Sequence, residues 1–305
     1  MDNASEGRFN ELPLGLFLAE FLFSEVHYTM NKKQVRALTE GAIMIALATV
    51  LSIFKIVDLP YGGSITLASM LPIAVISYRH GIGWGFISAF VYGVIQQLLG
   101  LNTLSYVTTW QSVLAVILLD YIIAFAVIGV SGVFRKKIKS QTVSLVLGSF
   151  LACLLRYACH VISGATVWAG LSIPTQAALS YSFIYNATYM VPETIIVLLF
   201  AAFLGSNIDL NASNPMRIKT ANIDKKHAWE MPVSIALIVS ALAFDTFMIF
   251  AHLQNAETGE FDITQLSQVS WLPVIIVTAV AAVAGVALLI DYSRAKTKAE
   301  TSIEK

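Results

Sequence analysis

Four ionisable side chains interrupt apolar stretches of this sequence. Asp120 lies in ILLDYIIAF, Arg156 and His160 lie in LLRYACHVISGA, and Glu193 lies in MVPETII. A charged side chain at the centre of a membrane helix costs about 2.5–3.5 kcal/mol on insertion scales, so such residues indicate a function by default. Glu193 directly follows Pro192, which frees a backbone carbonyl nearby, and its position favours a structural role.

The spacing of these groups predicts how they meet. Arg156 and His160 are four residues apart and share one face of a helix. Asp120 belongs to the neighbouring apolar stretch, so an ion pair between Asp120 and Arg156 that ties the two helices together is expected. Trp168 follows His160 by eight residues, about two turns, and projects from a similar face. Tyr181 and Asn186 begin the next apolar stretch.

A carboxylate, a histidine and several aromatic rings at membrane depth predict a binding cavity. Aromatic faces stack on flat rings, and both a carboxylate and a π face attract a cation. The set therefore suits a flat, cationic heteroaromatic ligand. No enzyme pattern competes with this interpretation, because the sequence contains no HExxH, GxSxG or Walker A motif and offers no catalytic residues.

The composition places these residues in an integral membrane protein. Hydrophobic residues make up 57% of the 305-residue chain and charged residues 12%, about half of the share usual for a soluble domain. The formal net charge is +0, and the absence of a basic patch excludes nucleic acid as a partner and leaves the lipid bilayer. Cys153 and Cys159 lie in an apolar run without ligand-like partners, so neither a metal site nor a cofactor is predicted.

Eight apolar runs are candidate membrane helices. They cover residues 37–54, 64–80, 82–100, 107–133, 142–165, 180–204, 232–252 and 269–291. With eight spans, every Lys/Arg cluster falls on one side of the membrane, which predicts a multi-pass protein of the cell membrane with both termini in the cytoplasm. The fold class is therefore an all-α integral membrane protein.

The predicted domain organisation has five parts. They are an N-terminal extension, interfacial or due to an upstream start codon (1–30), a six-helix binding domain (31–206), a cytoplasmic linker (207–231), two extra membrane helices (232–292) and a cytoplasmic tail (293–305).

Four stretches in this order resemble one known family. GGSITLASMLPIAVISYRHG, LLDYIIAFAVIGVSGVF, LLRYACHVISGA and YSFIYNATYMVPE together resemble the thiamine-specific S-component of energy-coupling factor (ECF) transporters, the ThiT family. The resemblance covers about residues 31–206. It implies a six-helix S-component bundle, a substrate site near the outer face, and a loop, here DLPYGGS with Tyr61, that closes over the site.

The resemblance also implies which residues bind thiamine. The acidic residue of the family's LEY or LDY motif matches Asp120, with Tyr121 beside it. The remaining matches are His160 of the RYxxH motif, the later tryptophan Trp168, the pair Tyr181 and Asn186, and the helix-three aromatic Tyr92. In this interpretation His160 faces the ligand, and Arg156 orients Asp120 or holds the helices together.

The implied partners supply the energy for transport. The sequence has no nucleotide-binding loop, and S-components dock on a transmembrane coupling protein that carries two ATPase subunits. Docking uses an AxxxA face on the first helix, which GAIMIALA provides as Ala42 and Ala46. Small residues at this spacing let helices approach closely.

Two departures and three alternatives stay open. The two extra helices and the N-terminal extension have no place in the six-helix family core. The ligand is thiamine, a thiamine precursor or another vitamin. A proton-coupled thiamine carrier is a further alternative, since one buried Asp and one His can form a proton relay, and a membrane enzyme using Asp120 and His160 is the third.

Overall fold

The computed structural model describes residues 31–59, 62–169, 175–176, 178–218, 226–253 and 262–301. The chain divides into two compact units, residues 1–36 and residues 37–305. The described part of the first unit is Asn31 and the beginning of the first helix, where the Asn31 side chain accepts hydrogen bonds from the backbone amides of Lys33 and Gln34. The prediction for residues 1–30 lies outside the described residues.

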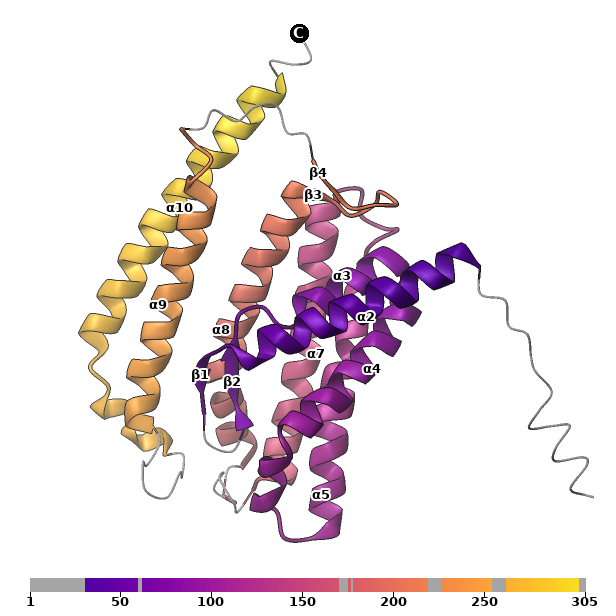
Figure 1. The fold of residues 1–305 in the computed structure, drawn as a ribbon. Helices are drawn as coiled ribbons and strands as arrows, with labels where there is room; N and C mark the ends of the chain where they lie inside the picture. Colours follow the sequence, from indigo (N-terminus) through magenta and orange to yellow (C-terminus); the bar gives the residue numbers. More distant parts are fainter. Residues whose placement is uncertain are drawn as a thin grey trace, which may run out of the picture. The chain divides into compact units, whose positions relative to one another are not determined.

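The described residues form helices joined by short turns and two small strand pairs (Figure 1). The α-helices are α2 (Lys32–Ile53), α3 (Leu71–His80), α4 (Ile82–Leu99), α5 (Trp110–Val116), α6 (Ala124–Ala126), α7 (Gln141–Thr166), α8 (Ala178–Asn207), α9 (Glu230–Leu253) and α10 (Trp271–Thr301). The 3₁₀ helices are η2 (Leu101–Tyr106), η4 (Val127–Gly132) and η5 (Ile263–Gln268), and η3 (Ile117–Ile123) is a π-helix. The strands are β1 (Lys55–Asp58), β2 (Ser64–Thr66), β3 (Ile208–Asp209) and β4 (Met216–Arg217), paired antiparallel as β1–β2 and β3–β4.

Seven of the eight predicted spans coincide with helices that are long and apolar enough to cross a membrane. Among the described residues these helices cover Lys32–Ile53, Ile82–Leu99, Trp110–Gly132, Gln141–Thr166, Ala178–Asn207, Glu230–Leu253 and Trp271–Lys296. The prediction of a predominantly helical, multi-span chain is therefore confirmed, with the two β-hairpins as an addition that the hydropathy pattern did not indicate.

The prediction of a membrane helix over residues 64–80 was wrong. Residues 64–66 form strand β2, and only the ten residues of α3 are helical, with Pro72 in the first turn. Ten residues rise about 15 Å, half of a bilayer's hydrocarbon core. Residues 71–79 of α3 are all buried, so their apolar character reflects packing inside the protein. Gly81, with φ at 95°, then turns the chain into α4.

Small residues let the central helices pack closely around α3. A Cβ atom added at Gly132 would clash with the Ser77 carbonyl oxygen, and one added at Gly148 would clash with the Ser131 carbonyl oxygen. The Ser77 hydroxyl donates a hydrogen bond to the Gly129 carbonyl and accepts one from the Gly132 amide. Close backbone approach and interhelical hydrogen bonds replace the hydrophobic driving force that helices lack in lipid.

A buried arginine joins the first helix to the chain that follows α8. Arg79, at the end of α3, binds both carboxylate oxygens of Glu40 on α2, with N–O distances of 2.8 and 3.0 Å. Its remaining donors reach backbone carbonyls of Leu210, Ala212 and Ser213. A bidentate pair of this kind fixes geometry more strongly than a single contact, so Arg79 fixes α2 against two other elements.

The last two membrane helices lie side by side and run in opposite directions (Figure 1). Ser234 of α9 donates to the Gly285 carbonyl of α10, and Thr278 of α10 donates to the Asp245 carboxylate of α9. Phe250 and Leu253 of α9 belong to the same apolar core cluster as residues of α8. Asp245 is an intramembrane carboxylate that the sequence analysis did not single out.

Candidate functional site

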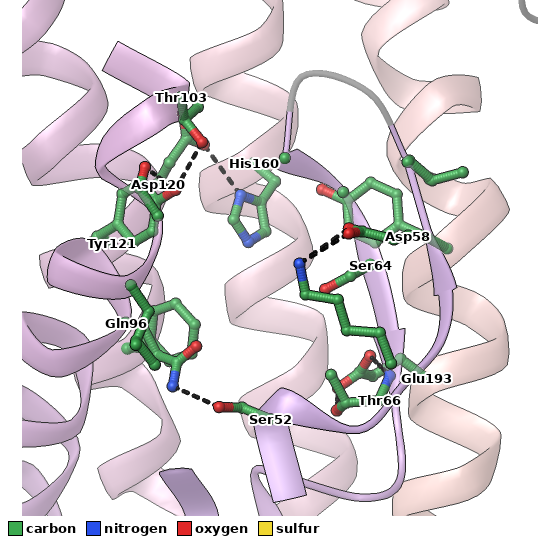
Figure 2. A pocket seen from close by; sticks show the side chains of 18 of the residues that line it. Ser52, Asp58, Ser64, Thr66, Gln96, Thr103, Asp120, Tyr121, His160 and Glu193 are labelled. Atoms are coloured by element: carbon green, nitrogen blue, oxygen red, sulfur yellow. Dashed lines mark hydrogen bonds and ion pairs between the residues drawn. The ribbon is translucent and has the colours of Figure 1, made fainter. Parts of the chain in front are cut away.

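A cavity of about 420 Å³ opens between the β1–β2 hairpin and the helices α4, η3, α7 and α8. Its volume falls in the range of about 300–1,000 Å³ that is typical of small-molecule sites. In Figure 2 the strands with Asp58, Ser64 and Thr66 face the turn with Asp120 and Tyr121 across the cavity, and His160 lies between them. All of these elements belong to the second unit, so one compact part of the chain builds the cavity.

Asp120 holds the centre of the hydrogen-bond network at one end of the cavity. One carboxylate oxygen lies 2.9 Å from Nδ1 of His160. The other accepts hydrogen bonds from the Ser163 hydroxyl at 2.6 Å and from Nε1 of Trp168 at 3.0 Å. Three donors from α7 and the residues after it stabilise the negative charge, and the side chain is still 15% exposed toward the cavity.

A π-helical turn positions Asp120 and its neighbour. η3 covers Ile117–Ile123, and both Asp120 and Tyr121 line the cavity although they are adjacent in sequence. A π-turn widens the helix by one residue and often occurs at functional sites. The Tyr121 hydroxyl donates to Oγ1 of Thr103 at 3.1 Å, which holds the ring against the loop after α4.

One ring nitrogen of His160 has no hydrogen-bond partner among the described residues. Its Nδ1 lies at the Asp120 carboxylate, which can only accept a hydrogen bond, so Nδ1 carries the hydrogen. In the neutral ring Nε2 is then an acceptor. Nε2 is buried and has no hydrogen-bond partner in the described part of the chain, and His160 lines the cavity. A buried acceptor of this kind favours a ligand that brings an N–H or O–H donor.

A second hydrogen-bond network, centred on Asn186, fixes the wall of the cavity that α8 forms. The Asn186 amide donates to the His160 and Ser182 carbonyl oxygens at 3.2 and 2.8 Å, and its own oxygen accepts from the Tyr189 hydroxyl. Asn186 is 4% exposed and lines the cavity together with Tyr185 and Tyr189. These contacts lock α8 to α7 at the level of His160.

The expected ion pair between Asp120 and Arg156 is absent from the described structure. The Asp120 carboxylate instead accepts hydrogen bonds from His160, Ser163 and Trp168. The Arg156 guanidinium instead lies 4.4 Å from the centre of the Phe125 ring, and one of its NH groups donates to Sδ of Met70 at 3.0 Å. Arg156 also lines the cavity.

Glu193 fastens the β1–β2 hairpin to α8. Its carboxylate accepts hydrogen bonds from the Thr66 backbone amide at 2.9 Å and from the Thr66 hydroxyl at 2.8 Å. Glu193 is 2% exposed, and Thr66 also bonds to Ser69. Because the hairpin forms one wall of the cavity, this buried attachment determines where that wall lies.

The cavity contains most of the residues predicted to bind a ligand. It is lined by Asp120, Tyr121, His160, Trp168, Asn186 and Tyr92. Tyr181 does not line it and instead packs on the apolar cluster around Trp168. Tyr61 lies outside the described residues.

The structure adds Thr66, Gln96, Ser52 and Glu193 to the lining. The spacing of four between Tyr185, Tyr189 and Glu193 was a signal that they share one helix face.

A polar, aromatic cavity enclosed by several membrane-spanning helices defines a multi-pass membrane protein with a small-molecule binding site. The profile of one family, described as thiamine transporter protein (Thia_YuaJ), matches residues 38–211, which is more than half of the chain. The chain belongs to this thiamine transporter family. The predicted resemblance is therefore confirmed.

Two relatives found by sequence agree with this assignment. The thiamine transporter ThiT of Bacillus subtilis is 40% identical over 179 residues, covering 55% of this chain and 89% of that protein. ThiT of Lacticaseibacillus paracasei is 24% identical over 192 residues, covering 56% and 88%. A solved structure of ThiT from Listeria monocytogenes has a TM-score of 0.48 and 23% identity, and covers 57% of this chain and 95% of that chain.

Proposed function

We propose that this chain is the substrate-binding membrane subunit, the S-component, of an ECF-type importer for thiamine. The observation that carries the proposal is the Asp120–His160 pair in the cavity, where Nε2 of His160 is buried and has no hydrogen-bond partner within the described ranges. Transport by this subunit involves no chemical change of the ligand. ATP hydrolysis belongs to partner subunits, since the chain has no nucleotide-binding loop.

The chemistry of thiamine fits the cavity. Thiamine carries a permanently cationic thiazolium ring and a flat aminopyrimidine. The Asp120 carboxylate offsets the positive charge at a depth where a lone charge would be unfavourable. Nε2 of His160 accepts a hydrogen bond from the aminopyrimidine amine, and the rings of Trp168 and Tyr189 provide faces for stacking.

The coupling proposal rests on one face of α2. Ala42 and Ala46 are both exposed, while Gly41 and Ala48 on the other side of the helix are buried. A stripe of small exposed residues allows a partner helix to approach closely. We assign this face to a transmembrane coupling protein that carries two ATPase subunits.

Thiamine binding to the purified chain in detergent tests the proposal directly. Trp168 is the tryptophan that lines the cavity among the residues described there, so bound thiamine is expected to quench its fluorescence. We expect saturable binding at one site, with the signal lost in Trp168→Phe and binding itself weakened in His160→Ala. A folded chain that binds a thiamine precursor or another vitamin but not thiamine would contradict the assigned substrate.

Replacing Glu193 by alanine is expected to speed the release of thiamine. The change leaves the buried Thr66 amide without its hydrogen-bond acceptor, which costs about 1–3 kcal/mol of free energy. It also releases the hairpin that forms one wall of the cavity. We expect a dissociation rate roughly 5- to 150-fold higher, with a much smaller change in the association rate. Stopped-flow fluorescence on the purified chain measures both rates.

Asp58→Ala is the matched control for this prediction. Asp58 lies in the same hairpin, and its ion pair with Lys55 joins side chains that are 59% and 43% exposed. Exposed pairs contribute about 0–1 kcal/mol, so this variant should release thiamine nearly as slowly as the unmodified chain. Equal release rates in the Glu193 and Asp58 variants would show that the Glu193–Thr66 contact does not hold the wall in place.

A further inference from the structure

Three potential metal ligands meet where α9 begins beside α10. His227 precedes α9, Glu230 is the first residue of α9, and Asp291 lies on α10. Nδ1 of His227 is 2.7 Å from Oε1 of Glu230 and 3.7 Å from Oδ2 of Asp291. One donor atom from each side chain lies within 4.8 Å of the other two. The cluster is outside the region that matches the thiamine transporter family.

The Glu230 carboxylate points to a missing partner in this cluster. Its side chain is 5% exposed, and its Oε1 is held at His227. Its other oxygen, Oε2, is buried and has no hydrogen-bond partner among the residues that the structure describes. A carboxylate oxygen that is removed from water without a partner is strongly unfavourable. A cation bound by the carboxylate removes this penalty without any change in the backbone.

The donor set indicates the kind of cation. One imidazole nitrogen and two carboxylates are ligands that Zn²⁺ and similar divalent transition metals accept. Bonds of about 2.0–2.2 Å in tetrahedral geometry place donor atoms roughly 3.3–3.6 Å apart. The separations of 2.7 and 3.7 Å from Nδ1 of His227 lie on either side of this range, and a bound metal replaces the hydrogen bond between His227 and Glu230. Asp291 is 60% exposed, which leaves water access to a fourth position.

We propose that His227, Glu230 and Asp291 form a binding site for a divalent transition metal of the zinc type. The metal joins the start of α9 to α10 and so stabilises the helix pair that distinguishes this chain from the matched family region. The site is separate from the thiamine cavity, whose lining contains none of the three residues. The proposal therefore does not depend on the proposed transport function.

Zinc binding to the full-length chain tests the proposal. The protein is purified in detergent without a polyhistidine tag, stripped with a chelator, and titrated with Zn²⁺ against a chromogenic competitor. Co²⁺ is used in parallel, because its visible absorption reports coordination by nitrogen and oxygen. We expect one equivalent of Zn²⁺ per chain and a higher unfolding temperature in its presence. His227→Ala should weaken binding at least tenfold, since even losing a residue that supports a ligand costs about 10–100-fold.

Two further variants complete the experiment. His252→Ala is the matched control, because His252 also lies on α9 but its Nδ1 faces the Met248 carbonyl, outside the cluster. It should bind zinc as the unmodified chain does. Asp291→Asn changes an exposed side chain and serves if His227→Ala does not fold; it should also weaken binding at least tenfold. No stoichiometric binding, or equal binding by the His227, Asp291 and His252 variants, would overturn the proposal.

Discussion

Asp120→Asn is expected to weaken thiamine binding by about 1.5–3 kcal/mol, the range for losing a hydrogen bond to a charged group. This corresponds to a dissociation constant roughly 10–150 times higher. The asparagine removes the negative charge that faces the thiazolium ring. It also keeps one acceptor oxygen where Asp120 uses two, so it cannot serve His160, Ser163 and Trp168 together. Isothermal titration calorimetry or fluorescence quenching on the purified chain measures the change.

One control variant and one control ligand distinguish the effect of the Asp120 charge from an effect on the structure of the cavity. Ser163→Ala removes one donor to Asp120 and keeps the carboxylate, so it should weaken binding less than Asp120→Asn does. An uncharged thiamine analogue, with a neutral ring in place of the thiazolium, should lose less affinity in the Asp120 variant than thiamine does. If Asp120→Asn weakens both ligands equally, the carboxylate acts by shaping the cavity and not by charge.

Ala46→Trp is expected to abolish thiamine uptake and to leave binding by the purified chain unchanged. Ala46 is exposed on α2 one turn after Ala42, and neither residue lines the cavity. A tryptophan there prevents the close helix approach that small residues permit. Uptake of labelled thiamine is measured in a thiamine auxotroph that expresses the chain together with an ECF coupling module. Ala42→Trp should give the same result.

Leu47→Trp is the control for surface bulk on the same helix. Leu47 is 45% exposed on the adjacent face of α2, so a tryptophan there presents the same bulky side chain away from Ala42 and Ala46. This variant should support uptake. Normal uptake by Ala46→Trp would place the docking surface elsewhere. Uptake that persists without the coupling module and stops with a protonophore would favour a proton-coupled carrier in place of an S-component.

The sequence by itself determined the membrane class and selected six of the residues that line the cavity. A helix that crosses lipid must satisfy its own backbone and carry apolar side chains, so hydropathy alone located seven helices. The same physics makes a polar side chain inside such a helix conspicuous, and for this reason Asp120, His160 and Asn186 could be selected from their positions. The order of four motifs then indicated the family that the profile match confirmed.

Hydropathy gave a wrong membrane helix where a segment is buried inside the protein, because such a segment is as apolar as one that is buried in lipid. Residues 64–80 are apolar because α3 is surrounded by other helices, and a sliding window does not distinguish the two environments. The hydropathy pattern did not predict the β1–β2 hairpin, for a related reason. Its short strands are stabilised by a distant partner, Glu193, through a contact between residues 127 positions apart.

Only the tertiary structure decided how the polar groups pair. Helix spacing places Arg156 and His160 on one face, and both are then within reach of Asp120. The π-turn at η3 and the residues after α7 determine which of the two side chains contacts Asp120. His160, Ser163 and Trp168 bind the carboxylate, and Arg156 lies against Phe125. A one-residue change of helical register and a turn after a helix are tertiary outcomes that side-chain periodicity does not encode.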